Sequence, residues 1–176
     1  IDLGTLNIAN DFTLTSNGTV SDSGNIEVGD LANFTSGGNP ITLGDGTTAN
    51  FGSLDFDGSL VTITEDSSMA IVAGKATGAL ILSANGKIEQ TGAIDADLAT
   101  SLSSGSNSIT LELANDFTGA VSLSNSGTND VSVNDINALD LGTVSVGRDL
   151  TVTSGGDLTD SGLITVPGLA KFVATN

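Results

Sequence analysis

The sequence predicts an all-β fold, a parallel β-helix of about seven to eight coils, from three observations. First, residues 1–36 align without a gap on residues 139–174, and 17 of the 36 pairs are identical. Second, bulky apolar residues recur about every 22 positions. Third, short segments alternate apolar and polar residues between turns rich in glycine and asparagine. Such short strands bury their apolar faces only when one coil stacks on the next.

The repeat has a hierarchy. Residues 80–94 form a weaker third copy, which matches residues 12–26 at a shift of 68 and residues 150–164 at a shift of 70. We therefore expect one β-helix segment over 1–176, with sequence cassettes of approximately 1–68, 69–138 and 139–176. Each full cassette would contain three coils of about 22–23 residues. Because the pattern is already running at Ile1 and still running at Asn176, we expect an internal fragment of a longer repeat array.

Strands are expected where apolar and polar residues alternate with a period of two, since that pattern marks strands with one buried face. In chain order these segments are 12–15, 41–43, 60–63, 80–82, 109–113, 121–123, 131–133, 144–146 and 150–152. Turns are expected at the glycine pairs between them and at both prolines, Pro40 and Pro167. A β-sandwich is the competing fold, but its strands have no reason to repeat a bulky residue every 22 positions.

The recurring bulky residues are predicted to stack in one column inside the rod. The column would contain Phe12, Phe34, Phe56, Leu80, Leu102, Leu123, Leu150 and Phe172. Phe51 and Phe117 are equivalents of each other in two copies, so all six phenylalanines are interpreted as core residues. A sugar-binding platform would instead use exposed Trp or Tyr, and the sequence has neither.

Charge and composition exclude several function classes. Four basic and 21 acidic residues give a net charge of -17, which disfavours nucleic acid and anionic lipid as partners. The sequence has no Cys, and it contains no run of the roughly 18 apolar residues that cross a membrane. High negative charge keeps a protein soluble, and it also suits saline surroundings or a supply of divalent cations.

The residues that could carry catalysis are few. The absence of His and Cys excludes Ser-His-Asp, Cys-His and His-based zinc chemistry. Two carboxylate pairs, Asp55 with Asp57 and Asp95 with Asp97, could in principle serve acid-base hydrolysis. A lyase acting on acidic sugars would also need clustered cations, whereas the basic residues are dispersed at Lys75, Lys87, Arg148 and Lys171. We therefore expect no enzyme and assign no catalytic residue.

No cofactor or metal-binding residue is assigned, although calcium stays possible because the chain is rich in oxygen ligands. The turns at Gly44-Asp45-Gly46 and Gly155-Gly156-Asp157 are suggestive, but neither matches a calcium-binding repeat. Two aspartates recur at equivalent positions of the repeat, which we attribute to a shared turn rather than to an ion. The equivalent pairs are Asp11 with Asp149 and Asp22 with Asp160.

Two further expectations depend on the register of a 22-residue coil. The position after Phe12 runs Thr13, Thr35, Asp57, Ile81, Ser103, Ser124, Thr151 and Val173, so no flat threonine ladder for ice binding results. The same register stacks Asp149 against Lys171, which precede Leu150 and Phe172, and predicts an exposed ion pair of little energetic weight.

Several segments resemble the repeats of filamentous-haemagglutinin-like bacterial surface proteins. They are ANDFTGAVSLSNSG, INALDLGTVSVGRDLTVTSGGDLTDSG and SGGNPITLG. The resemblance covers nearly the whole chain, and it implies a right-handed β-helix, secretion, and a role as adhesin, stalk or cell-surface filament. The amino-terminal secretion module of such exoproteins is not visible in this sequence.

Together these observations predict a non-enzymatic shaft of an extracellular adhesin or surface filament, located on the bacterial surface or secreted. The alternative is a fibre subunit that stacks end to end through open strand edges. A carbohydrate-active β-helix enzyme and an ice-binding protein are the less favoured alternatives. The expected partners are neighbouring repeats of the parent protein or further copies of the chain. A host-cell, surface or glycan ligand would bind through parts outside this chain.

Overall fold

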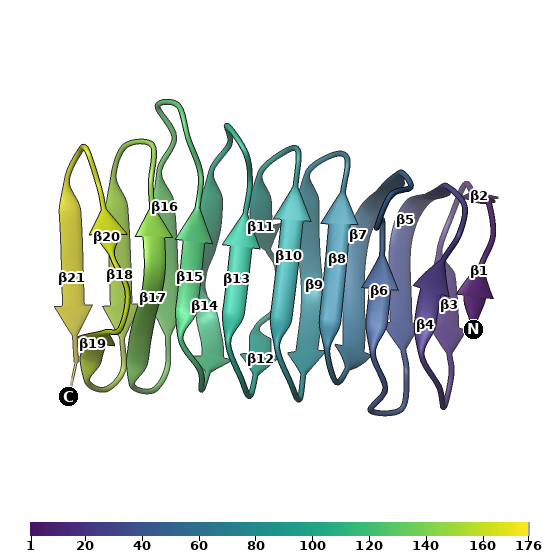
Figure 1. Cartoon of the computed structure of the whole chain (residues 1–176), viewed down its shortest axis with the longest axis horizontal. Coiled ribbons are helices and arrows are strands. Elements are labelled where there is room, and N and C mark those ends of the chain that lie inside the picture. Colours follow the sequence, from purple (N-terminus) through teal and green to yellow (C-terminus); the bar gives the residue numbers. More distant parts are fainter. Residues whose placement is uncertain (176) are drawn as a thin grey trace.

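A computed structural model describes residues 1–175, and all regular secondary structure in this range is β. The strands form two sheets that run along a rod, with the two ends of the chain at opposite ends of it (Figure 1). The first sheet contains β1 (Asp2–Leu3), β4 (Val20–Asp22), β6 (Ile41–Leu43), β8 (Val61–Glu65), β10 (Leu80–Ala84), β13 (Thr100–Ser103), β15 (Val121–Ser124), β17 (Leu139–Ser145), β19 (Leu158–Asp160) and β20 (Ile164–Thr165). The second contains β2 (Leu6–Ile8), β3 (Phe12–Thr15), β5 (Ile26–Thr35), β7 (Ala49–Gly58), β9 (Met69–Ala76), β11 (Ile88–Gln90), β12 (Ile94–Ala96), β14 (Ile109–Phe117), β16 (Val131–Asp135), β18 (Leu150–Ser154) and β21 (Ala170–Ala174).

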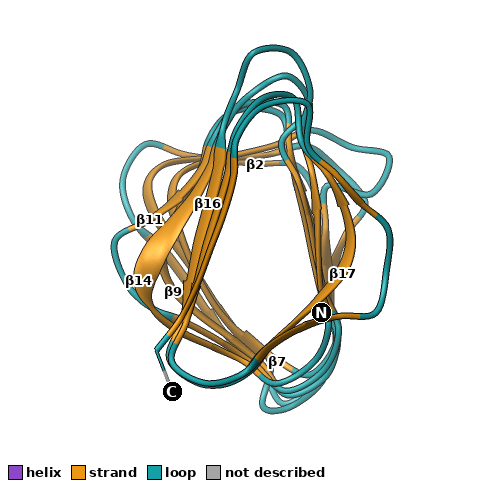
Figure 2. Ribbon diagram, turned by 90° about the vertical axis from the view of Figure 1, so that its left-hand side faces the viewer, coloured by secondary structure: helices purple, strands orange, loops and turns teal. Residues whose placement is uncertain are grey.

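Each strand pairs in parallel with strands of the neighbouring turns, and the chain alternates between the two sheets as it advances. This arrangement is a β-solenoid of about nine turns, so the predicted fold class is confirmed and the predicted seven to eight coils is close. Seen along the rod, the strands surround one continuous interior (Figure 2). The parallel pairing excludes the antiparallel β-sandwich.

The turns are shorter and less regular than the predicted coil of 22–23 residues. Residues paired between neighbouring turns are 17 positions apart at Leu54 and Ile71, and 23 positions apart at Ile26 and Ala49. Most other pairs differ by about 19 to 21 positions, as Leu80 and Thr100 do. The length varies because the polar loops between strands vary and because some strand pairs, such as β5 with β7 and β7 with β9, contain a register shift.

The sequence repeat is therefore longer than three turns, and successive copies begin on different sheets. Phe12 lies in the second sheet, its counterpart Leu80 lies in the first, and Leu150 lies again in the second. The local register is nevertheless conserved between the first and last copies. Leu14 pairs with Phe34, and 138 positions later Val152 pairs with Phe172.

This offset makes the single predicted column wrong. Phe34 does pair with Phe56, and Leu102 with Leu123, but the two pairs lie on different sheets. After Phe56 the second sheet continues to Gly74 instead of Leu80. A Cβ at Gly74 would lie 2.5 Å from the Phe56 ring, so the glycine makes room for that ring.

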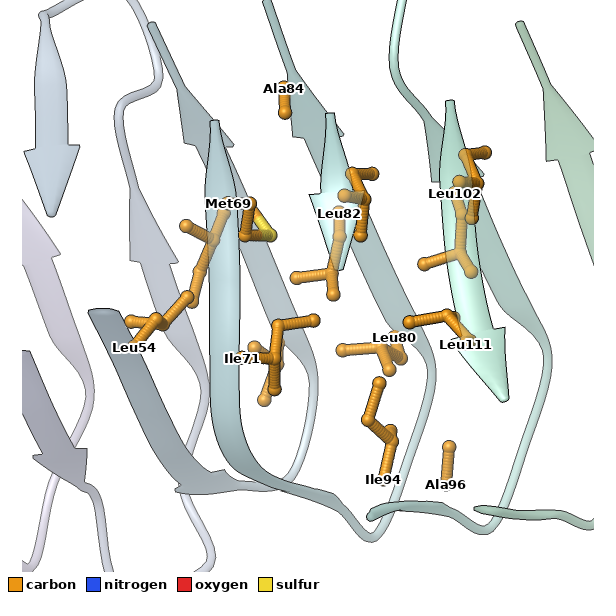
Figure 3. Packing of buried hydrophobic residues seen from close by; sticks show 14 of the residues in the cluster. Leu54, Met69, Ile71, Leu80, Leu82, Ala84, Ile94, Ala96, Leu102 and Leu111 are labelled. Carbon is orange, nitrogen blue, oxygen red and sulfur yellow. The ribbon is translucent and has the colours of Figure 1, made fainter. Parts of the chain in front are cut away.

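The interior is filled by aliphatic side chains from both sheets, which meet across the rod (Figure 3). Phe34, Phe51, Phe56 and Phe117 are buried there, and Phe12 is half-buried. The rings of Phe12 and Phe51 lie 5.8 and 5.7 Å from that of Phe34; the Phe12 ring is tilted against it, and the Phe51 ring meets it edge to face. Phe172 departs from the prediction, because 46% of its surface is exposed on the last turn.

Candidate functional site

Three of the carboxylates that the sequence singled out, Asp55, Asp57 and Asp95, lie on the outer face of the second sheet, and Asp97 lies in the bend after β12. Asp55 accepts a hydrogen bond from the Asn33 amide at 2.9 Å, and partial burial together with the charge of Asp57 raises the pKa of Asp55. Lys75 pairs with Asp57 on one neighbouring strand and with Asp95 on the other. Lys75 thus lies between two carboxylates, and Asp95 has a further carboxylate, Asp116, on its other side.

The recurring aspartates hold the turns together. Asp11 accepts the backbone N–H of Leu31 at 3.1 Å, and Asp149 accepts that of Leu169 at 2.8 Å, in each case from the following turn. Asp22 in the same way accepts the N–H of Gly44 at 2.9 Å. Asp11 and Asp149 thus make the same contact in two copies of the repeat, which supports the shared-turn interpretation.

Gly44 and Gly46 have φ angles of 71° and 78°, which glycine adopts without strain. They belong to the turn that Asp22 binds. Within residues 1–175, acidic side chains form no group of three or more that could hold a metal ion. No helix in the same range is long and apolar enough to cross a membrane.

The predicted ion pair between Asp149 and Lys171 is wrong. Leu150 pairs with Ala170, so the last turn is shifted by two residues from the prediction and Lys171 lies beside Thr151. Arg148 instead binds Asp130, with 2.6 Å between Nε and Oδ1. That hydrogen bond lowers the pKa of the Asp130 carboxyl, and both side chains are exposed.

The observed register reveals a surface that sequence reasoning missed. The strands of the first sheet point two columns of hydroxyl side chains outward. Neighbouring strands align them as Ser21, Thr42, Thr62, Ile81, Ser101 and Ser122 in one column and Thr64, Ser83, Ser103, Ser124, Ser145 and Thr165 in the other. We call these two columns the hydroxyl face. Ile81 is its one apolar member, and the first column is continued beyond Ser21 by the charged Asp2 on β1.

The hydroxyl face differs from the rest of the molecule in charge. The outer face of the second sheet carries Asp57, Lys75, Asp95 and Asp116 on successive strands, whereas the hydroxyl face of this highly acidic chain carries none. A hollow of about 230 Å³ lies on it, lined among others by Ser101, Ser122, Thr143 and Ser145. The motifs Thr-Ile-Thr at 62–64, Ser-Leu-Ser at 101–103 and Ser-Leu-Ser at 122–124 could have indicated it, had the shorter turn been known.

Two buried carboxylates were also missed. Glu65 is fully buried and Asp135 is 1% exposed, each as the last residue of a strand whose alternate residues point inward. The N–H of Phe51 binds Glu65 at 3.1 Å, and that of Phe117 binds Asp135 at 2.7 Å. Burial raises the pKa of Glu65 to about 7 and also raises that of Asp135. The alternation Val61, Ile63, Glu65 was the available signal.

Fold and surfaces together define a β-solenoid repeat protein. The chain belongs to the family described as "Repeats of unknown function (DUF5649)", whose model matches residues 1–55, 58–124 and 128–176. The family model thus recurs three times and accounts for nearly the whole chain. No curated protein and no solved structure shows significant similarity to it.

Proposed function

We propose that the chain is a non-enzymatic structural shaft, part of a stalk or filament of a bacterial surface adhesin. The observation that carries the proposal is the unbroken parallel ladder through both sheets, over one continuous core. Nine rungs about 4.8 Å apart give a stiff rod of roughly 40 Å. Each turn rests on its neighbours, so a longer array of the same repeat would lengthen the rod without changing its construction.

Sequence resemblance and net charge support an extracellular location for this shaft. The resemblance to filamentous-haemagglutinin-like repeats and the charge of -17 favour an extracellular, secreted or surface-bound position. Neighbouring repeats of the same parent protein are its direct partners, and a host or glycan ligand would bind elsewhere in that protein. No cofactor enters the proposal.

The absence of Cys allows a direct test of stiffness by spin labelling. Ser23→Cys and Ser161→Cys place labels at equivalent turns, 138 positions apart. A rigid shaft gives one narrow distance distribution between the labels, centred at about 30–40 Å. A distribution as broad as that of a flexible linker contradicts the proposal. Circular dichroism of the labelled variant controls for folding.

The hydroxyl face favours a second candidate function, the binding of ordered water or ice. Its hydroxyls repeat about every 4.8 Å across strands and about every 6.6 Å along them, a regular two-dimensional array of donors and acceptors. Such an array can hydrogen-bond a water layer that is ordered in the same way. The charged face of the second sheet offers no comparable regularity.

Thermal hysteresis and inhibition of ice recrystallisation test this second function. The double variant Ser101→Lys and Ser122→Lys should abolish either effect, because it places two strongly hydrated charges in the array. Thr110→Lys with Ser132→Lys is the matched control, since these paired residues point outward from the second sheet. Absence of both effects in the unmodified chain, or their equal loss in the control, contradicts ice binding.

A further inference from the structure

Exposed apolar residues gather beside the hydroxyl face in the middle of the rod. They are Leu60, Ala79, Ile81, Leu98 and Ala99, and we call them the apolar patch. Leu60, Ile81 and Leu98 are 41%, 40% and 57% exposed. The strands β8, β10 and β13 around the patch each pair on both sides, so no missing turn explains this exposure. Because apolar side chains that gather on a surface mark contact sites, the patch indicates an interaction surface.

The strand pairing brings the apolar patch together. Val61, Leu80 and Thr100 lie side by side on β8, β10 and β13, and all three are buried. The residue before each of them belongs to the patch and points outward, because side chains alternate between the two faces of a strand. Ile81 follows Leu80 and points to the same side, and Leu98 lies in the bend that leads into β13. The patch therefore covers three successive turns at one edge of the hydroxyl face.

The hydroxyl face extends this surface over five neighbouring strands, β6, β8, β10, β13 and β15, and its members on these strands are all uncharged. Pro40 and Ala120 continue the outward column of the patch at the outer two strands, where the backbone bonds join the same positions. The second sheet, by contrast, carries Asp57, Asp95 and Asp116 on its outer face. Two chains with a net charge of -17 can therefore meet through the first sheet without opposing their carboxylates.

This uncharged surface is complementary to itself. A hydroxyl group both donates and accepts hydrogen bonds, so a column of hydroxyls can bond to an identical column. An apolar patch loses its contact with water when it packs against a second one. We propose that two copies of the chain pair side by side as antiparallel rods, patch against patch, about a two-fold axis through Ile81. The stiffness of the shaft requires no such pair, so this inference goes beyond the function proposed above.

The antiparallel direction follows from the position of the apolar patch along one edge of the hydroxyl face. A two-fold axis that crosses the rods at Ile81 sets Leu60 of each copy opposite Leu98 of the other. Asp97, which precedes Leu98, then lies opposite Ser59 instead of a second carboxylate. Parallel rods would set the patch against the opposite edge of the partner's hydroxyl face, where it meets no apolar residue of the patch.

Sedimentation at physiological ionic strength, where repulsion between the acidic rods is screened, tests the pair. Five strands about 4.8 Å apart make a small interface, so the dissociation constant should be micromolar or weaker. The unmodified chain should form dimers and nothing longer, since a two-fold pair is closed. Leu60→Lys with Ile81→Lys should weaken dimerisation at least about thirty-fold. The matched control is Val72→Lys with Leu113→Lys, which adds the same charge at apolar residues 37% and 40% exposed on the second sheet, and it should dimerise like the unmodified chain.

Disulfide cross-linking determines the direction of the rods, because the chain has no Cys of its own. With oxidised glutathione, Ile81→Cys should link to a second copy of itself. Ser122→Cys should link to Thr42→Cys and not to itself, since the two-fold axis sets β15 opposite β6. Melting curves establish that the variants are folded. The proposal is overturned if the unmodified chain stays monomeric at millimolar concentration, if the patch variant and its control dimerise equally, or if Ser122→Cys links to itself as readily as to Thr42→Cys.

Discussion

Glu65 and Asp135 are the last residues of β8 and β16, and we call these two strand ends the corners. The corners occupy equivalent places in two copies of the repeat, yet the hydrogen bonds to their buried carboxylates differ. At Asp135 the two oxygens are used separately: Oδ2 accepts the N–H of Phe117 and Oδ1 accepts the N–H of Asn137, both at 2.7 Å. At Glu65 a single oxygen, Oε1, accepts both the N–H of Phe51 at 3.1 Å and the Ser67 hydroxyl at 2.9 Å.

The other oxygen of Glu65, Oε2, is buried and has no hydrogen-bond partner within residues 1–175. A buried carboxylate oxygen without a donor is costly, and protonation removes that cost. This explains why desolvation raises the pKa of Glu65 to about 7, although Phe51 and Ser67 oppose the shift. Burial raises the pKa of both carboxyls, and the two residues differ in how their donors are shared: two donors reach two oxygens of Asp135 but only one oxygen of Glu65.

The largest expected effect on stability comes from substituting Asp135, whose two carboxylate oxygens each accept a hydrogen bond. Asp135→Ala leaves the N–H groups of Phe117 and Asn137 without their acceptor in or near the core. We expect the free energy of unfolding at pH 7 to fall by about 3–4 kcal/mol, measured in urea. Asp135→Asn, which keeps an oxygen acceptor, should lose clearly less. Equal losses in the two variants would show that packing, not hydrogen bonding, determines the cost.

The second prediction concerns the pH dependence of the other corner. The pKa of Glu65 in the folded chain, about 7, exceeds its ordinary value of 4.5, so the folded state binds the extra proton between these pH values. Its contribution to stability is therefore fully present below about pH 4.5 and is lost as the pH rises through 7. The loss should amount to roughly 2–3 kcal/mol.

Glu65→Gln isolates this contribution, because glutamine is neutral at every pH while the other carboxylates still titrate. The difference in unfolding free energy between the variant and the unmodified chain should shift in favour of the variant as the pH is raised from 4.5 to 8. A difference that stays constant over this range would mean that Glu65 titrates alike in the folded and unfolded chains, and would remove the contrast between the corners.

The two corners also show what sequence reasoning could and could not supply. The strands, the parallel stacking and the inward position of Glu65 all follow from a period of two and from internal repetition. The turn length does not, because loops such as 125–130 vary in length and several strand pairs contain register shifts. With turns of about 20 residues and a repeat of 68 to 70, the assumed coil of 22–23 residues led us to place Leu80 after Phe56 in one column, although the two lie on different sheets.

The same limit explains the missed hydroxyl face and the missed acids. Which outward residues become neighbours depends on the register between turns, and an error of two residues placed Ser103 beside Ile81, where the structure has Ser101. In the sequence, an acidic residue at an inward position interrupts the alternation of apolar and polar residues, so it does not indicate a buried side chain. Glu65 and Asp135 are tolerated inside because backbone N–H groups bind them. These groups belong to Phe51, 14 positions before Glu65, and to Phe117, 18 positions before Asp135.

The smallest predicted effect concerns the second hydrogen-bond donor of each corner, Ser67 for Glu65 and Asn137 for Asp135. Ser67→Ala removes a side-chain donor from the Glu65 carboxylate, which should cost about 1 kcal/mol at pH 8–9, where the group is ionised, and less at pH 5. Asn137→Ala keeps the backbone N–H that binds Asp135, so it should cost under about 0.5 kcal/mol. Urea unfolding of both variants at the two pH values measures this contrast. If Ser67→Ala costs as much at pH 5 as at pH 9, the hydroxyl is not a donor to the ionised carboxylate, and the two corners differ only in the length of their acidic side chains.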